Sequence, residues 1–146
     1  MTKFTTDKTY TVLTPEQRKG RKKMAVNINV EQRQGRIIAR ISGELDHHTA
    51  KHIRADIDSA IREANPRALV LDFSAVSFMD SSGIGLVMGR YKIMTELSGE
   101  VIVANPPHYI RKVMTLAGLD KLCKIISLSY EENDNTKKNF LEVEQK

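Results

Sequence analysis

The chain has 146 residues, a length that fits one domain able to bury well over half of its unfolded surface. No apolar run approaches the ~20 residues that span a bilayer, and no stretch has the pattern of a signal peptide. The single cysteine, Cys123, excludes an intramolecular disulfide and fits a reducing compartment. The sequence therefore predicts a cytoplasmic protein with no membrane partner, in which Cys123 is a small buried thiol.

The net charge of +5 comes from the start of the chain. Residues 1–23 hold seven basic and two acidic side chains, whereas residues 24–146 contain 16 of each sign. The part that is expected to fold is therefore neutral, which disfavours direct binding of nucleic acid.

Residues 1–23 are rich in Thr and Lys and lack a sustained periodicity, which predicts a disordered basic leader. Three interpretations remain open: an arm that contacts anionic partners, a spacer, or a segment that is not translated in the cell. The third has a specific motive, because the run Arg18–Lys23 can be encoded in purine codons and directly precedes Met24. A purine-rich ribosome-binding sequence would translate into such a run, so we favour Met24 as the native start.

Residues 24–130 have the pattern of a folded domain. Apolar and polar residues alternate on both sides of a loop that contains Gly35, which predicts an antiparallel hairpin with one buried face. Residues 43–46 are expected to turn the chain into an amphipathic helix that ends near Ala64. Asp46 is the predicted N-cap of that helix.

Strands and helices alternate in the second half of this domain. An apolar run at 68–73 predicts a strand buried on both faces, and the helix after it is expected to end at Gly99. A strand at 100–104, a helix over 107–118 and a short edge strand at 124–126 follow.

This alternation predicts an α/β fold, with a small, mixed, mostly parallel sheet, an N-terminal antiparallel hairpin and amphipathic helices packed on the sheet. Ser129 begins the pattern of a capping box for a C-terminal helix. Because that helix would be nearly all polar in its middle, residues 131–146 are expected to form a weakly helical tail.

The turn after the 68–73 strand carries the main candidate residues. Ser82 is the predicted N-cap of the next helix, which leaves Ser81 on a loop at the carboxyl end of a central strand. Open α/β sheets usually place their working residues there. Three glycines remove side chains from the start of the helix, so that another surface can approach closely. They are Gly83, Gly85 and Gly89.

The sequence gives little support for catalysis. Ser81 and Ser82 lack the Gly-x-Ser-x-Gly elbow, and none of the four histidines has the partner pattern of a general base. The phosphate-loop and dinucleotide motifs are missing too. His48 and His52 have the spacing of zinc ligands, but no Glu follows His48 and no cysteine lies nearby. We therefore expect that the protein is not an enzyme and binds no cofactor and no metal. The histidines are expected to be exposed at a contact surface.

Two neighbouring residues of the second helix are assigned opposite environments. Tyr91 belongs to the apolar face and is predicted in the core, whereas Arg90 is predicted to be exposed. By local pattern alone, Ser81 and Ser82 would be two capping serines at a helix start.

Four stretches share the pattern of a known family. They are Gly-Glu-Leu-Asp-His-His-Thr-Ala at 43–50, Ser-Phe-Met-Asp-Ser-Ser-Gly-Ile-Gly at 77–85, Met-Gly-Arg-Tyr-Lys at 88–92 and Leu-Ala-Gly-Leu at 116–119. They resemble the anti-sigma factor antagonists, which are STAS domains, and the similarity runs from about Met24 to Ser127. The Asp-Ser-Ser-Gly turn occurs in many STAS domains, whereas the Leu-Asp-His-His-Thr run is more specific.

The resemblance implies a switch rather than an enzyme. In that family the unmodified protein binds an anti-sigma factor, itself a serine kinase, and frees a sigma factor, here for sporulation transcription. The kinase uses ATP to phosphorylate the first serine of the turn, which matches Ser81, and a metal-dependent serine phosphatase restores binding. We expect the partner to contact Asp46, His47, His48, Asp80, Ser81, Ser82, Gly83, Gly85 and Arg90.

Phosphorylation is expected to act at the interface rather than on the fold. A phosphate adds about −1.5 to −2 charges and would meet free N–H groups and the positive end of the helix dipole. Two alternatives stay open: a domain of the same fold in a general stress partner switch, and a small-molecule or nucleotide-binding module that uses the bare helix at 83–89.

Overall fold

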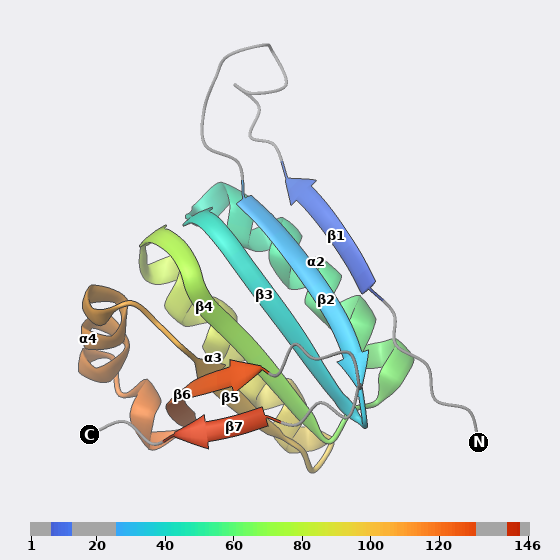
Figure 1. The fold of residues 1–146 in the computed structure, drawn as a ribbon. Helices are drawn as coiled ribbons and strands as arrows, with labels where there is room; N and C mark the ends of the chain where they lie inside the picture. Colours follow the sequence, from blue (N-terminus) through green and yellow to red (C-terminus); the bar gives the residue numbers. More distant parts are fainter. Residues whose placement is uncertain (1–6, 13–25, 131–139, 144–146) are drawn as a thin grey trace.

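The computed structural model describes residues 7–12, 26–130 and 140–143. Within this part of the chain, one seven-stranded sheet runs in the order β1 to β7 (Figure 1). The strands are β1 (Asp7–Val12), β2 (Val26–Arg33), β3 (Arg36–Leu45), β4 (Ala68–Met79), β5 (Glu100–Ala104), β6 (Lys124–Tyr130) and β7 (Phe140–Val143). The helices are α2 (His47–Ala64), α3 (Ser81–Glu96) and α4 (His108–Leu116), with a 3-10 turn, η1, at Leu119–Lys121.

The type of strand pairing changes twice across the sheet. β1, β2 and β3 pair antiparallel, β3 to β6 pair parallel, and β7 pairs antiparallel to β6. The β2–β3 hairpin turns through Gln34 and Gly35, which both have positive φ (53° and 79°), as a two-residue turn that follows the strand twist requires. The predicted α/β fold, with an antiparallel hairpin that leads into parallel strands, is confirmed.

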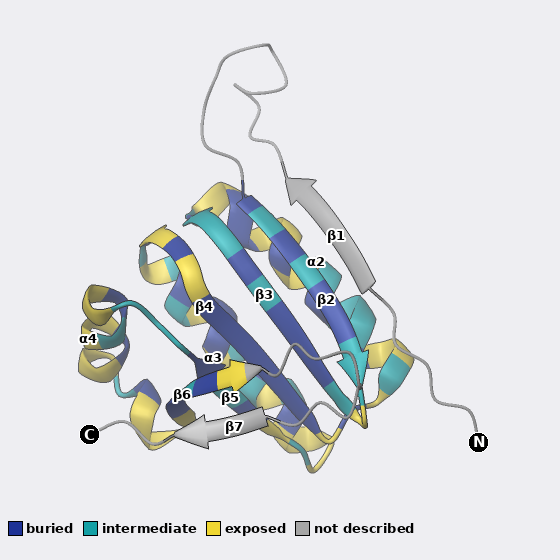
Figure 2. Ribbon diagram, in the orientation of Figure 1, coloured by how far each residue is buried: buried dark blue, intermediate teal, exposed yellow. Residues whose placement is uncertain are grey.

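The main core lies between one face of the sheet and the helices. Figure 1 shows α2 and α3 on that face, and the alternating apolar residues of β2 and β3, such as Ile28 and Ile41, are buried against them. A smaller cluster on the other face joins Ile38 and Val70 to Ile126 of β6. The first six residues of β4, 68–73, are therefore all buried, as predicted (Figure 2).

The expectations for the two ends of the chain need correction. Residues 7–12 form β1, paired with β2 from Asp7↔Glu31 to Val12↔Val26, so disorder was the wrong prediction for them. The other residues of 1–23 lie outside the described residues. Ser129 belongs to β6 and not to a helix cap, and 140–143 forms a strand that pairs with β6, which is therefore not an edge strand. Backbone pairing with a second strand outweighs a local capping pattern here.

Strand pairing also moves the ends of the central strands. β3 continues through the expected turn at 43–46 as far as Leu45, and β4 continues from Phe73 to Met79. The two strands remain paired to their last residues, with two register shifts on the way. This extension determines where α2 and α3 begin.

Candidate partner-binding site

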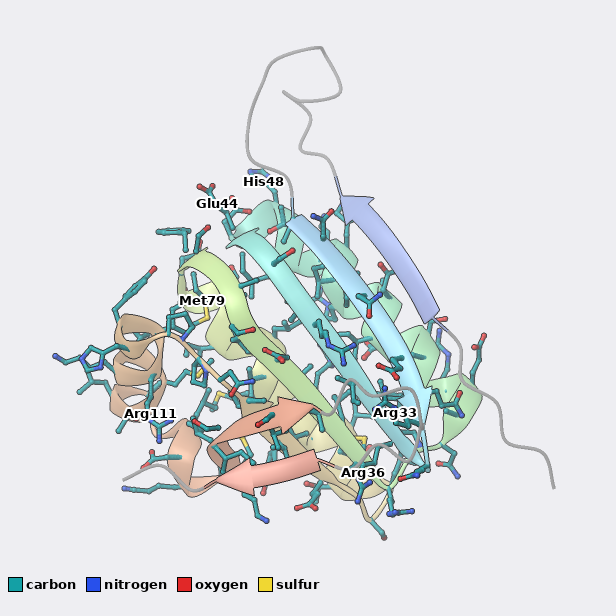
Figure 3. The ribbon with its side chains drawn as sticks, viewed as in Figure 1. Arg33, Arg36, Glu44, His48, Met79 and Arg111 are labelled. Carbon is teal, nitrogen blue, oxygen red and sulfur yellow. The ribbon has the colours of Figure 1, made fainter. Side chains whose placement is uncertain are left out.

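The carboxyl ends of β3 and β4 lie side by side. Leu45 pairs with Met79, and the Asp80 N–H donates to the Leu45 carbonyl at 3.3 Å. Figure 3 shows Glu44 and His48 at the same edge of the sheet as Met79. The two motifs singled out in the sequence, around Asp46 and around Ser81, therefore meet at this edge.

The Leu-Asp-His-His-Thr run is a helix start with two exposed rings. Asp46 Oδ1 accepts from the backbone N–H groups of His48 (2.9 Å) and Thr49 (3.1 Å). Thr49 Oγ1 accepts from the Asp46 N–H at 3.0 Å and completes a capping box. The predicted N-cap is confirmed. His47 and His48 are exposed, with ring centroids 5.3 Å apart, so both rings are accessible to a partner that binds at this edge.

Helix α3 begins two residues earlier than predicted. Asp80 is the N-cap of α3, and its Oδ1 accepts from the Ser82 N–H at 2.8 Å. Ser81 is the first residue of the helix and is exposed, whereas Ser82 is half-buried. The prediction of Ser82 as N-cap and Ser81 as a loop residue was wrong, because a carboxylate is a strong acceptor for the positive helix end and lies where β4 stops.

The glycines of α3 have different environments. Gly83 is buried, and a Cβ there would overlap Met79 Cγ and Sδ and lie 3.3 Å from Leu45 Cδ2. It serves the packing of α3 on the ends of β3 and β4. A Cβ at Gly85 or Gly89 would meet nothing within 4 Å, so these two positions leave the helix backbone open to an approaching surface.

Arg90 is buried, which corrects the prediction that it is exposed. Its side chain is 6% exposed, and Nε lies 3.0 Å from Asp58 Oδ1 of α2. Burial lowers the pKa of Arg90 and the nearby charge of Arg54 lowers it further, while Asp58 opposes this shift. Arg90 thus ties α3 to α2 beneath the surface. Tyr91 is half-buried against the main core.

Two further sequence predictions concern a pair of histidines and the single cysteine. His48 and His52 are both exposed, and no group of potential metal ligands occurs among the described residues. Cys123 is buried as predicted, and burial, followed by the charge of Asp120, raises the pKa of its thiol to about 11.

Within the described ranges, no helix has the length and apolar character needed to cross a membrane.

Residues 27–133 match the STAS domain, and the chain belongs to this family. A relative from Paenibacillus polymyxa, an anti-sigma F factor antagonist, is 39% identical over 104 residues, which cover 70% of this chain and 87% of the relative. The chain is thus a member of the anti-sigma factor antagonist family, as the motifs predicted. An anti-sigma-B factor antagonist from Bacillus subtilis is 28% identical over 107 residues, which cover 73% of this chain and 95% of the relative.

Two solved structures of the antagonist SpoIIAA have the same fold. The unphosphorylated form matches with a TM-score of 0.63 and 35% identity, over 70% of this chain and 88% of the other. The phosphorylated form matches with a TM-score of 0.59 and 35% identity, over 70% and 91%.

Proposed function

We propose that this chain is a cytoplasmic, non-enzymatic switch of the anti-sigma F type. Unmodified, it binds an anti-sigma factor kinase at the edge formed by the ends of β3 and β4, and the bound sigma factor is released to start sporulation transcription. Phosphorylation of Ser81 ends this binding, and a serine phosphatase restores it. The observation that carries the proposal is the exposed Ser81 hydroxyl at the first position of α3, next to the exposed His47 and His48.

Ser81 is better placed than Ser82 to accept a phosphoryl group. Ser81 is exposed, whereas Ser82 is half-buried and its N–H is held by Asp80. In the transfer, the γ-phosphoryl group of ATP forms a bond with Ser81 Oγ, the hydroxyl proton leaves, and ADP is the other product. The kinase supplies the catalytic groups, and this chain supplies the acceptor.

The new charge is expected to act mainly on the partner. The positive end of α3 favours a phosphate on Ser81, whereas the Asp80 carboxylate repels it, so the two effects on the fold oppose each other. The partner surface, which fits a bare hydroxyl, meets both the bulk and the charge. A loss of ~3 kcal/mol would weaken binding more than a hundredfold.

The test is the intact mass of the chain after incubation with the purified kinase from its own organism and ATP. We expect a gain of one phosphate in the wild type and in Ser82→Ala, and none in Ser81→Ala. Ser81→Ala should still bind the kinase, since it keeps the unmodified shape, and should no longer be released by ATP. Ser81→Asp is a poorer mimic, because one carboxylate carries less charge and bulk than a phosphate.

Two results would contradict the proposal in different ways. Stoichiometric phosphorylation of Ser81→Ala within the turn would make Ser82 the acceptor. No phosphate on the wild type, with the kinase active on another antagonist, would remove the mechanism and leave a constitutive binding module.

A role in a general stress switch is the second candidate. The Bacillus subtilis anti-sigma-B factor antagonist matches this chain over 95% of its own length, but its 28% identity is lower than the 39% of the anti-sigma F factor antagonist. Parallel binding assays with the F-type and B-type kinases of the source organism separate the two roles, and we expect the tighter complex with the F type.

A further inference from the structure

Helix α4 is apolar on two sides. Ile110 and Met114 point into the main core and are fully buried. A second set, with the helical spacing i, i+4, i+7, is exposed to solvent: Tyr109 (46% exposed), Val113 (36%) and Leu116 (84%). A surface helix usually carries polar residues on its outer side, so this second apolar stripe needs a function.

Two further exposed apolar residues lie on the elements that carry Ser81. Phe78, at the end of β4, and Met88, seven residues after Ser81 on the same side of α3, are also large exposed apolar side chains. Because β4 and β5 are parallel neighbours, α3 and α4 both start at the same edge of the sheet. Figure 2 shows exposed residues both on α4 and at the end of β4.

Five of the seven large exposed apolar residues in the described ranges belong to this region. Leu97 and Leu122 are the other two. A concentration of exposed apolar side chains marks an interaction site more strongly than scattered single residues do. On α3, a Cβ at Gly85 would meet nothing within 4 Å, so a partner element can lie close to the helix backbone there.

We propose that the anti-sigma factor that binds Ser81 also docks an apolar element on this surface, which we call the α4 surface. It consists of Phe78, Met88, Tyr109, Val113 and Leu116. The inference rests on the proposed function, because its occupant is the same partner. The start of α4 at the same edge of the sheet as the serine turn favours this occupant over a second copy of the chain.

The α4 surface also gives a physical reason for the strength of the switch. A partner seated on Phe78 and Met88 excludes water from the rim of the serine turn. A phosphate on Ser81 would then lose part of its hydration at the interface. Apolar docking beside the serine therefore makes binding of the phosphorylated form more unfavourable than charge alone in open water would.

The test compares substitutions on α4 with a matched control. Leu116→Lys and Tyr109→Ala should each weaken binding of the purified kinase about tenfold or more in calorimetric titration. Leu97→Lys is the control, because Leu97 is 43% exposed but lies at the end of α3 away from Ser81. The affinity of this variant for the kinase should stay within about twofold of the wild-type value. Thermal unfolding should be unchanged in Leu116→Lys, since this side chain is almost wholly in solvent.

The outcomes separate this inference from the proposed function. Wild-type affinity in both α4 variants, with the kinase binding normally, overturns the docking and leaves the proposed function intact. Absence of any binding to the wild type overturns both. A wild-type dimer in light scattering that Leu116→Lys converts to a monomer, with kinase affinity unchanged, assigns the α4 surface to a second copy and also overturns the proposal.

Discussion

Two glycines of α3, two positions apart, have opposite physical roles. Gly83 lies against Met79 and Leu45, where the helix rests on the ends of the strands, and has no room for a methyl group. Gly85 faces open space, where a methyl group meets nothing and only reduces the freedom of the unfolded chain. The same substitution at the two positions therefore has opposite signs.

We expect Gly83→Ala to lower the free energy of unfolding by about 1–3 kcal/mol, because Met79 must move within a packed site. Gly85→Ala should raise it by up to about 1 kcal/mol. Urea unfolding of the two variants measures both effects against the wild type. Equal effects at the two positions would show that helix propensity, and not packing under Gly83, governs the start of α3.

At the scale of the elements, the Arg90–Asp58 pair connects the two helices that border the candidate site. Asp58 Oδ1 and Arg90 Nε lie 3.0 Å apart, and Arg90 is almost wholly buried. The Arg90 Nη1 atom has no hydrogen-bond partner within the described part of the chain. Asp58 is therefore the counter-charge on which the buried Arg90 depends, and we expect the spacing of α2 and α3 to depend on this pair.

We expect Asp58→Ala to cost about 3 kcal/mol, because it leaves a buried guanidinium without its ion-pair partner. Arg90→Met in the same chain should recover part of this loss, since it removes the buried charge and keeps most of the volume. The free energies of unfolding of the two single variants and the double variant give the coupling. Arg54→Ala, on the exposed side of α2, is the control and should change stability by less than about 0.5 kcal/mol. Zero coupling would exclude a joint role for the pair.

At the scale of the whole molecule, β1 is an addition to the family's domain. The STAS match covers residues 27–133, and β1 at Asp7–Val12 precedes it. β1 pairs only with β2 among the strands and covers what is otherwise the edge of the sheet. Two strands, β2 and β3, separate it from β4 and the serine turn.

We expect a chain that begins at Met24 to fold and to bind the kinase with unchanged affinity, because its main core and its serine turn are intact. The amide groups of β2 should exchange with solvent faster than in the full chain, since their edge is no longer covered. Hydrogen exchange and calorimetric titration on both chains measure these effects. Loss of folding or of kinase binding in the shorter chain would make β1 an integral part of the domain.

The features that could be predicted from the sequence are those that neighbouring residues specify. Asp46 stands directly before an amphipathic run and has Thr49 three residues later, so its cap was visible locally. The end of α3 was predicted less well: the left-handed residue is Ser98 (φ 63°), and Gly99 is required because a Cβ there would lie 2.9 Å from the Arg67 carbonyl oxygen. Arg90 was assigned to the surface because its partner, Asp58, lies on a different helix.

The α/β class, the hairpin, the buried strand at 68–73 and the exposed serine turn followed from periodicity and capping patterns, which are local properties of the chain. Only the tertiary structure decided that Asp80 caps α3, that Arg90 is buried and that α4 presents a second apolar side. The first depends on how far β4 pairs with β3, and the other two depend on which helix faces contact the core. Contacts between segments far apart in the chain determine these features, and no local pattern contains that information.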